Sequence, residues 1–118
     1  MIMAIKRYET NKRWSRAVIH NGVVYFCGQV AKELVPDVAE QTRTTLEKID
    51  ELLASVGSDK SKILSATIYL KDISTFNEMN EVWDNWVPEG CAPARACIQG
   101  AATNPEELVE ILIVAAVD

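Results

Sequence analysis

The fold is first indicated by the stretch AVIHNGVVYFC at residues 17–27. Two β-rich runs, residues 17–20 and 23–27, flank the dipeptide Asn21-Gly22. Both of these residues accept the positive φ of a type I′ turn, so an Asn-Gly pair between such runs is a strong hairpin signal. We therefore predict two antiparallel strands joined at residues 21 and 22, with a short strand near Arg7 and Tyr8 before them.

After the hairpin, the hydrophobic pattern changes to the period of a helix. Apolar and threonine side chains recur at three- and four-residue steps from Val38 to Val56, and charged residues fill the other faces. Asp37 supplies an N-cap and Gly57 a natural end for this helix. A second amphipathic helix, with Ser74 as its candidate cap, is predicted from one apolar stripe: Phe76, Met79, Trp83, Trp86 and Val87.

Three more runs, residues 63–70, 95–99 and 108–117, are predicted to be strands. The near-continuous apolar character of residues 63–70 predicts burial on both faces. The last two runs are predicted to form a hairpin centred between Ala102 and Thr103, in which Arg95 and Glu110 are opposite each other on one face. The expected fold is one α+β domain over residues 1–118, in the order β-β-β-α-β-α-β-β, with both helices on one face of a mixed sheet.

Two helices can cover only one face of such a sheet. The last strand is apolar at nearly every position, and the chain has no further element to cover its second face. A homo-oligomer that packs sheet against sheet is therefore expected.

Composition narrows the possible functions. The 118 residues carry 12 Lys and Arg against 17 Asp and Glu, a net charge of −5, which disfavours nucleic acid as a partner. Three irregularly spaced cysteines (Cys27, Cys91 and Cys97) and a single histidine match no disulfide framework or metal-site pattern. The first seven residues contain no apolar run of signal-peptide length, and residues 111–117 are too short to span a membrane. We expect a cytoplasmic protein without metal or membrane contact.

Glu110 is the unusual residue of the last strand, because a carboxylate in so apolar a run is costly unless it is paired. Arg95 is the candidate partner. One interpretation is a buried ion pair with a purely structural role. In the other, Arg95 binds a substrate carboxylate and Glu110 positions water or handles a proton. Cys97 lies on the Arg95 face as a wall of that site, since no histidine is predicted within reach to make it a nucleophile.

The remaining chemically capable residues carry less information. His20 precedes the tight turn and is expected at the surface. Trp14 is distinctive because it lies in the polar segment of residues 11–15 rather than in an apolar stripe, and Asn80 on the second helix is a candidate cap or interface contact. The glycines form no phosphate-binding pattern.

The motif Pro-Ala-Arg-Ala-Cys at residues 93–97, followed by Pro105 and the run Val-Glu-Ile at residues 109–111, resembles the reactive intermediate deaminase (Rid/YjgF) family, also called endoribonuclease L-PSP. The glutamate fifteen residues after the arginine is the most specific part. Residues 25–30, 41–46 and 66–72, with Phe76 and Asn80, extend the resemblance over nearly the whole chain. Residues 13–15 and 83–86 resemble the YoaB-like branch of that family.

This resemblance implies a chorismate-mutase-like fold, assembled as a barrel-like homotrimer with three clefts between subunits. It implies hydrolysis of reactive enamine and imine acids, such as 2-iminobutanoate, 2-iminopropanoate or 2-aminoacrylate, to 2-oxo acids and ammonia without a cofactor. Arg95 would hold the substrate carboxylate, backbone groups near Arg95 and Cys97 would orient the imine, and Glu110 would position the attacking water. Trp14, Cys27 and Asn80 would complete the substrate-binding set.

Two positions depart from the family pattern. Trp14 stands where many active members carry a tyrosine, and Cys27 stands where a serine is common. Both changes alter the wall of the cleft and its hydrogen bonding. The alternative function is therefore a non-catalytic trimer that binds small carboxylate metabolites as a sensor or partner protein. Ribonuclease activity or translation inhibition, a third possibility, is disfavoured by the acidic balance and by the absence of a basic and aromatic surface pattern.

Overall fold

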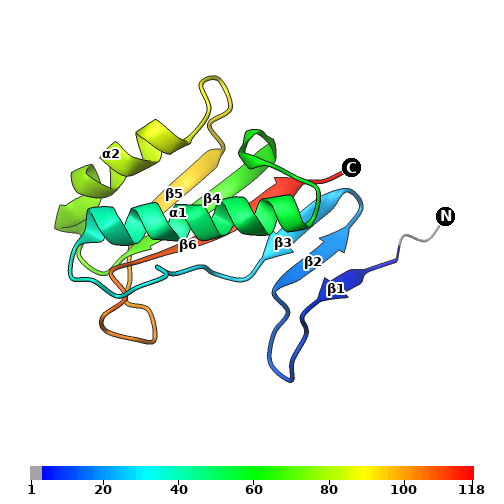
Figure 1. Cartoon of the computed structure of the whole chain (residues 1–118), viewed down its shortest axis with the longest axis horizontal. Helices are drawn as coiled ribbons and strands as arrows, with labels where there is room; N and C mark the ends of the chain where they lie inside the picture. The colour runs from blue at the N-terminus through cyan, green and yellow to red at the C-terminus, as the bar shows by residue number, and fades with distance from the viewer. Residues whose placement is uncertain (1–3) are drawn as a thin grey trace.

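The computed structural model describes residues 4–118 as one six-stranded sheet with two α-helices (Figure 1). Residues 1–3, which begin the segment used above to predict the cellular location, lie outside the described residues. The elements are β1 (Lys6–Tyr8), β2 (Ala17–His20), β3 (Val23–Phe26), α1 (Val38–Ser55), β4 (Ile63–Leu70), α2 (Phe76–Trp86), β5 (Ala94–Gln99) and β6 (Val109–Ala116), with 3₁₀ turns η1 (Lys60–Lys62) and η2 (Ile73–Thr75). The order β-β-β-α-β-α-β-β is confirmed.

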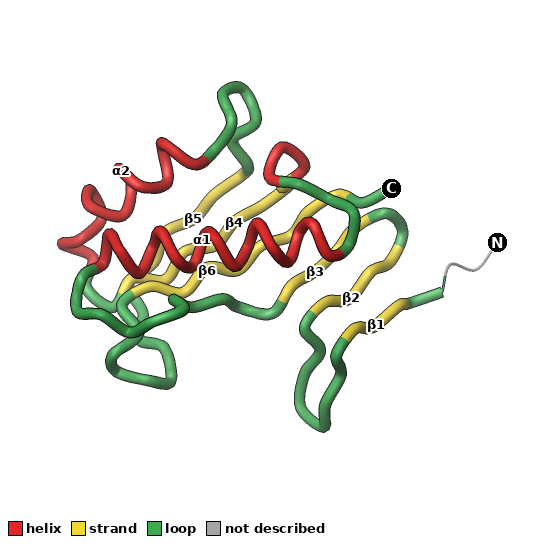
Figure 2. The backbone as a smooth tube through the Cα atoms, in the orientation of Figure 1, coloured by secondary structure: helices red, strands yellow, loops and turns green. Residues whose placement is uncertain are grey.

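The strands lie side by side in the order β1-β2-β3-β6-β4-β5. Every neighbouring pair is antiparallel except β4 and β5, which run parallel. Both helices lie on the same face of this mixed sheet (Figures 1 and 2). Among residues 4–118, no helix is long and apolar enough to cross a membrane.

The predicted hairpin forms between β2 and β3. Asn21 and Gly22 have φ angles of 52° and 73°, the left-handed backbone that a type I′ turn requires. His20 pairs with Val23 next to the turn. Contrary to the expectation of a surface position, the His20 side chain is half-buried, and its Nδ1 has no hydrogen-bond partner among the described residues.

The first helix begins and ends where its sequence predicts. The Asp37 side chain accepts a hydrogen bond from the backbone N–H of Ala39, and Gly57 adopts a φ of 77° after the last turn. The second helix differs at its start. Ser74 is not its cap, because η2 precedes α2 and Asp72 accepts the hydrogen bond from the backbone N–H of Ser74.

The predicted hairpin between the last two strands is wrong. β4 lies between β5 and β6 and pairs with both, in parallel with β5 and antiparallel with β6. In this register Arg95 is beside Ala66, and Glu110 is beside Tyr69. The two strands are instead joined by residues 100–108, which cross the end of β4.

Burial alternates along the central strands and separates the sheet into two faces. The face under the helices forms the core, with Ile68 of β4 and Ile111 and Ile113 of β6 almost fully buried. Burial of β4 on both faces is not found within one chain, since Thr67 and Tyr69 on the opposite face remain partly exposed. That opposite side, called the open face below, has no helix over it (Figure 1).

Candidate functional site

Glu110 lies on the open face, in the middle of the sheet. It belongs to β6 and is the direct cross-strand neighbour of Tyr69 in β4. Burial raises the pKa of the Glu110 carboxyl above its usual value, and the nearby charge of Glu107 raises it further. Such a carboxylate holds a proton more readily than an exposed one and is a stronger base when ionised.

A cavity of about 330 Å³ opens beside Glu110. Gly28 forms one wall, and a Cβ at this position would collide with the Glu110 carboxylate. Tyr69 contributes the other polar side chain, with small or apolar residues around the remainder: Ala101, Ala102 and Leu112. The glycine therefore leaves the space that the carboxylate occupies.

Sequence reasoning missed Tyr69 and Gly28 as parts of this cavity. The sequence predicts Tyr69 as one residue of an apolar strand, and the family resemblance includes it within residues 66–72 and Gly28 within residues 25–30 without a role for either. The alternation of side chains along β4 is the signal that assigns it to the face opposite Ile68 and Leu70.

Arg95 lies on the other face of the sheet, beside α2. Its Nη1 donates a hydrogen bond of 2.8 Å to Oδ1 of Asn80. The guanidinium also lies over two aromatic rings, 5.4 Å from the centroid of Trp83 and 5.8 Å from that of Phe76. Because β5 is an edge strand and Arg95 is exposed, its remaining N–H groups can bind a carboxylate.

The predicted placement of Arg95 and Glu110 on one face is therefore wrong. Arg95 shares its row across the sheet with Ala66 and Ile113, which face the core. Glu110 shares its row with Tyr69 and Ile98 on the open face. Two strand spacings and three residues along the strands separate their Cα atoms by roughly 14 Å. No ion pair joins the two in the described part of the chain.

The two cysteines of the predicted site accompany different groups, Cys97 on the strand of Arg95 and Cys27 next to Gly28 in the wall of the Glu110 cavity. Cys97 points to the same face as Arg95 and packs against the core. Burial raises the pKa of the Cys97 thiol, which disfavours a reactive thiolate. Cys27 is next to Gly28, and its Sγ accepts a hydrogen bond of 3.3 Å from Nε2 of Gln29.

Trp14 lies on a different part of the sheet from Arg95 and Glu110. It lies in the loop between β1 and β2, at the edge opposite β5, and its side chain is 53% exposed. The Asn11 side chain accepts hydrogen bonds from the backbone N–H groups of Arg13 and Trp14, so the loop has a defined shape. One chain thus presents three separate groups, around Arg95, Glu110 and Trp14.

Across residues 4–118, no three of the His, Cys, Asp and Glu side chains gather closely enough to hold a metal ion. Glu110, Arg95 and Tyr69 supply a carboxylate, a guanidinium and a phenol.

Comparison with known proteins identifies the family. The family model described as endoribonuclease L-PSP matches residues 4–117. The RutC family protein YoaB of Escherichia coli K12 is 49% identical over 98% of this chain and 100% of its own. A 2-iminobutanoate/2-iminopropanoate deaminase from Rattus norvegicus is 32% identical over 86% of this chain and 78% of its own.

A solved structure agrees with the fold. The crystal structure of a YjgF-family member from Neisseria meningitidis has a TM-score of 0.93 and 44% identity, covering 98% of this chain and 97% of that one. The resemblance to the YoaB-like branch is likewise confirmed by the relatives that carry that name. The chain therefore belongs to the Rid/YjgF family, which the matching model describes as endoribonuclease L-PSP.

Proposed function

We propose that this protein is a deaminase that hydrolyses small imino and enamine acids, such as 2-iminobutanoate, to 2-oxo acids and ammonia. The observation that carries the proposal is the Glu110 carboxylate beside a cavity of about 330 Å³, with its pKa raised by burial. Family membership supports it, since a relative from rat bears the name of this activity. The small lining side chains suit a substrate of a few carbon atoms.

The proposed site is built from two copies of the chain. Within one chain, Arg95 and Glu110 are on opposite faces of the sheet, and a small acid cannot contact both. The uncovered open face gives a second copy a surface on which to pack. In the proposed homotrimer, the edge strand β5 of one copy brings its Arg95 to the Glu110 cavity of the next.

In the proposed reaction, Arg95 binds the substrate carboxylate through two N–H donors. Glu110 orients a water molecule, which adds to the carbon of the protonated C=N bond and gives one proton to the carboxylate. That proton passes to the nitrogen of the resulting carbinolamine. The C–N bond then breaks with its electron pair leaving on ammonia, and the hydroxyl group gives its proton to the Glu110 carboxylate as the C=O bond forms. Orientation of the water and the imine supplies much of the rate.

In the proposed site, Trp14 and Cys27 form walls of the cleft. Cys27 adjoins Gly28 and therefore lies beside the Glu110 cavity. The exposed Trp14 belongs to a loop at the far edge of the sheet, where it is available to a neighbouring copy. Asn80 acts through Arg95, because its amide oxygen holds the guanidinium.

The test supplies 2-iminobutanoate in situ from a threonine dehydratase and follows 2-oxobutanoate release with and without semicarbazide. We expect faster 2-oxo acid release and less semicarbazone in the presence of catalytic amounts of the protein. Rates equal to those in buffer would contradict the deaminase proposal. Saturable calorimetric binding of 2-oxobutanoate without acceleration would instead identify a carboxylate-binding protein.

A further inference from the structure

A groove of about 490 Å³ lies between α1 and α2, on the side of the molecule away from the open face. Its volume falls within the roughly 300–1,000 Å³ of small-molecule sites. Its apolar lining residues are Leu46, Val82 and Trp86. None of the proposed deaminase residues lines this groove.

The indole of Trp86 is held in a defined orientation. Its Nε1 donates a hydrogen bond of 3.0 Å to Oδ2 of Asp50, which joins α2 to α1. The ring of Trp83 packs beside it at 5.3 Å between centroids. An aromatic face fixed in this way is a prepared surface for a cation.

A cation of the chain itself already occupies that surface. The Lys60 ammonium lies 5.4 Å from the centroid of the Trp86 ring. Within residues 4–118, Lys60 forms no ion pair. An ammonium without a carboxylate partner therefore lies on the ring face of Trp86. This position indicates that the groove suits a ligand with an ammonium group.

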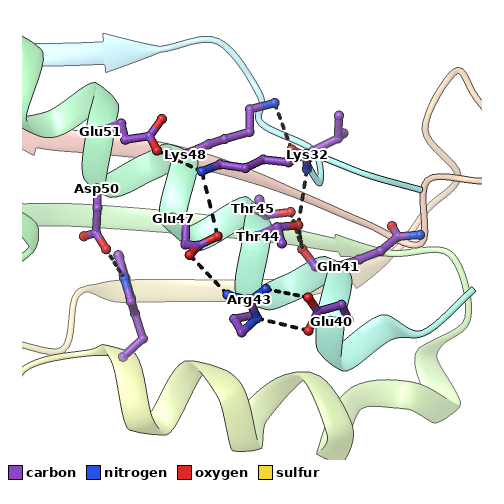
Figure 3. A network of polar contacts seen from close by, with 12 residues as sticks. Lys32, Glu40, Gln41, Arg43, Thr44, Thr45, Glu47, Lys48, Asp50 and Glu51 are labelled. Carbon is purple, nitrogen blue, oxygen red and sulfur yellow. Dashed lines mark hydrogen bonds and ion pairs between the residues drawn. The ribbon is translucent and has the colours of Figure 1, made fainter. Parts of the chain in front are cut away.

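The charges around the groove favour a cation as well. Arg43 is bound to both Glu40 and Glu47, so its positive charge is neutralised along α1 (Figure 3). Two lining carboxylates, Asp50 and Glu81, then remain against the single ammonium of Lys60. Glu81 has no ion pair in the described part of the chain.

We propose that this groove binds a linear aliphatic ammonium or diammonium ion. One ammonium replaces that of Lys60 over Trp86, near Asp50, and the chain lies on Leu46 and Val82 toward Glu81. The groove runs from Arg43 to Asp50 along α1, a rise of about 10 Å, which accommodates an alkyl chain of about four carbons with a charge at each end. This site is independent of the proposed deaminase activity.

Titration of the full-length protein with 1,4-diaminobutane tests the site directly. The readout is the indole N–H signal of Trp86 in a ¹⁵N–¹H spectrum, assigned by its loss in Trp86→Phe. We expect a saturable shift with millimolar affinity that weakens as salt is added. Butane-1,4-diol, the uncharged analogue, should leave the signal in place. No shift with the diamine, or an equal shift with the diol, would overturn the proposal.

Two surface variants sharpen the test with matched controls. Glu81→Gln should weaken diamine binding about fivefold, whereas Glu78→Gln, on the same helix outside the groove, should not. Lys60→Ala should strengthen binding several-fold because it removes the competing ammonium. Lys62→Ala removes the same charge two residues away, where Lys62 pairs with Asp118. Equal effects of Lys60→Ala and Lys62→Ala would show only general electrostatics and would contradict a site over Trp86.

Discussion

Arg95 and Glu110 point to opposite faces of one sheet, and β4 runs between the strands that carry them. In the proposed site, their side chains therefore form two half-sites. The first holds the Arg95 guanidinium against α2, and the second holds a carboxylate in a small cavity on the open face. A substrate that needs both groups requires them to come from different copies of the chain.

Gly28 leaves the space in which the Glu110 carboxylate lies, and Gly28→Ala should displace that carboxylate. The backbone at Gly28 is outside the left-handed region, so the alanine adds a collision and no backbone strain. A flexible carboxylate moves at little cost in stability, but misplacement of a catalytic group by an ångström costs about 10²-fold in rate.

We therefore expect kcat/KM for imine hydrolysis to fall by about tenfold or more, with a nearly unchanged melting temperature. Gly100→Ala is the comparison, because its Cβ would meet the ring of Tyr69 at 3.4 Å and no atom of Glu110, so it should lose less activity than Gly28→Ala. Full activity of Gly28→Ala would argue against a role for the Glu110 carboxylate.

Asn80 should act as a positioning residue for Arg95. Asn80→Ala removes the 2.8 Å hydrogen bond to the guanidinium, so the KM of the substrate should rise about threefold to tenfold while kcat changes little. Asn77→Ala, on the exposed surface of the same helix, should behave like the wild type. A loss confined to kcat would contradict this role and would assign Asn80 to the chemical step.

The raised pKa of Glu110 predicts a dependence of stability on pH. A carboxyl whose pKa is higher in the folded state stabilises the fold when protonated, and this contribution is lost as pH rises from its unfolded pKa through its folded pKa. Glu110→Gln is neutral at every pH. The free energy of unfolding of Glu110→Gln, measured with urea at one chain concentration, should therefore exceed that of the wild type by more at pH 7 than at pH 4. An advantage that is largest at pH 4 would mean that the folded-state pKa is lowered.

The open face predicts the mass of the protein in solution. Val114 in β6 and Tyr25 in β3 are neighbours on this face, and Tyr25 is 49% exposed in the single chain. Light scattering should give the mass of three chains, and Val114→Lys should shift it toward one chain because burial of an unpaired charge is costly. A monodisperse monomer of the wild type would contradict both the covered open face and the two-copy site.

The local elements of this fold could be predicted from the sequence because their signals are local. The positive φ angles of Asn21 and Gly22 follow from their residue types. The helix cap at Asp37 and the helix end at Gly57 follow from the positions of these residues just before and just after the apolar helical pattern. The predicted pairing of Arg95 with Glu110 is wrong because the order of strands in a sheet depends on contacts between residues far apart in the chain.

The correct pairing did have a signal in the sequence. A strand, a helix and a strand in succession, at residues 63–99, favour a parallel pair with a crossover helix, which is the relation of β4 to β5. That rule would have removed the hairpin and separated Arg95 from Glu110.

A deaminase site shared between copies of the chain is tested most directly by subunit mixing. Arg95→Ala and Glu110→Gln should each be inactive as pure proteins. After the two variants are unfolded together and reassembled in equal amounts, about one quarter of the sites in randomly mixed trimers would combine an intact Arg95 with an intact Glu110 from the next copy. We predict recovery of about that fraction of the wild-type deaminase activity. Mixed trimers that form, as mass spectrometry would verify, yet stay as inactive as the parent variants would contradict the account.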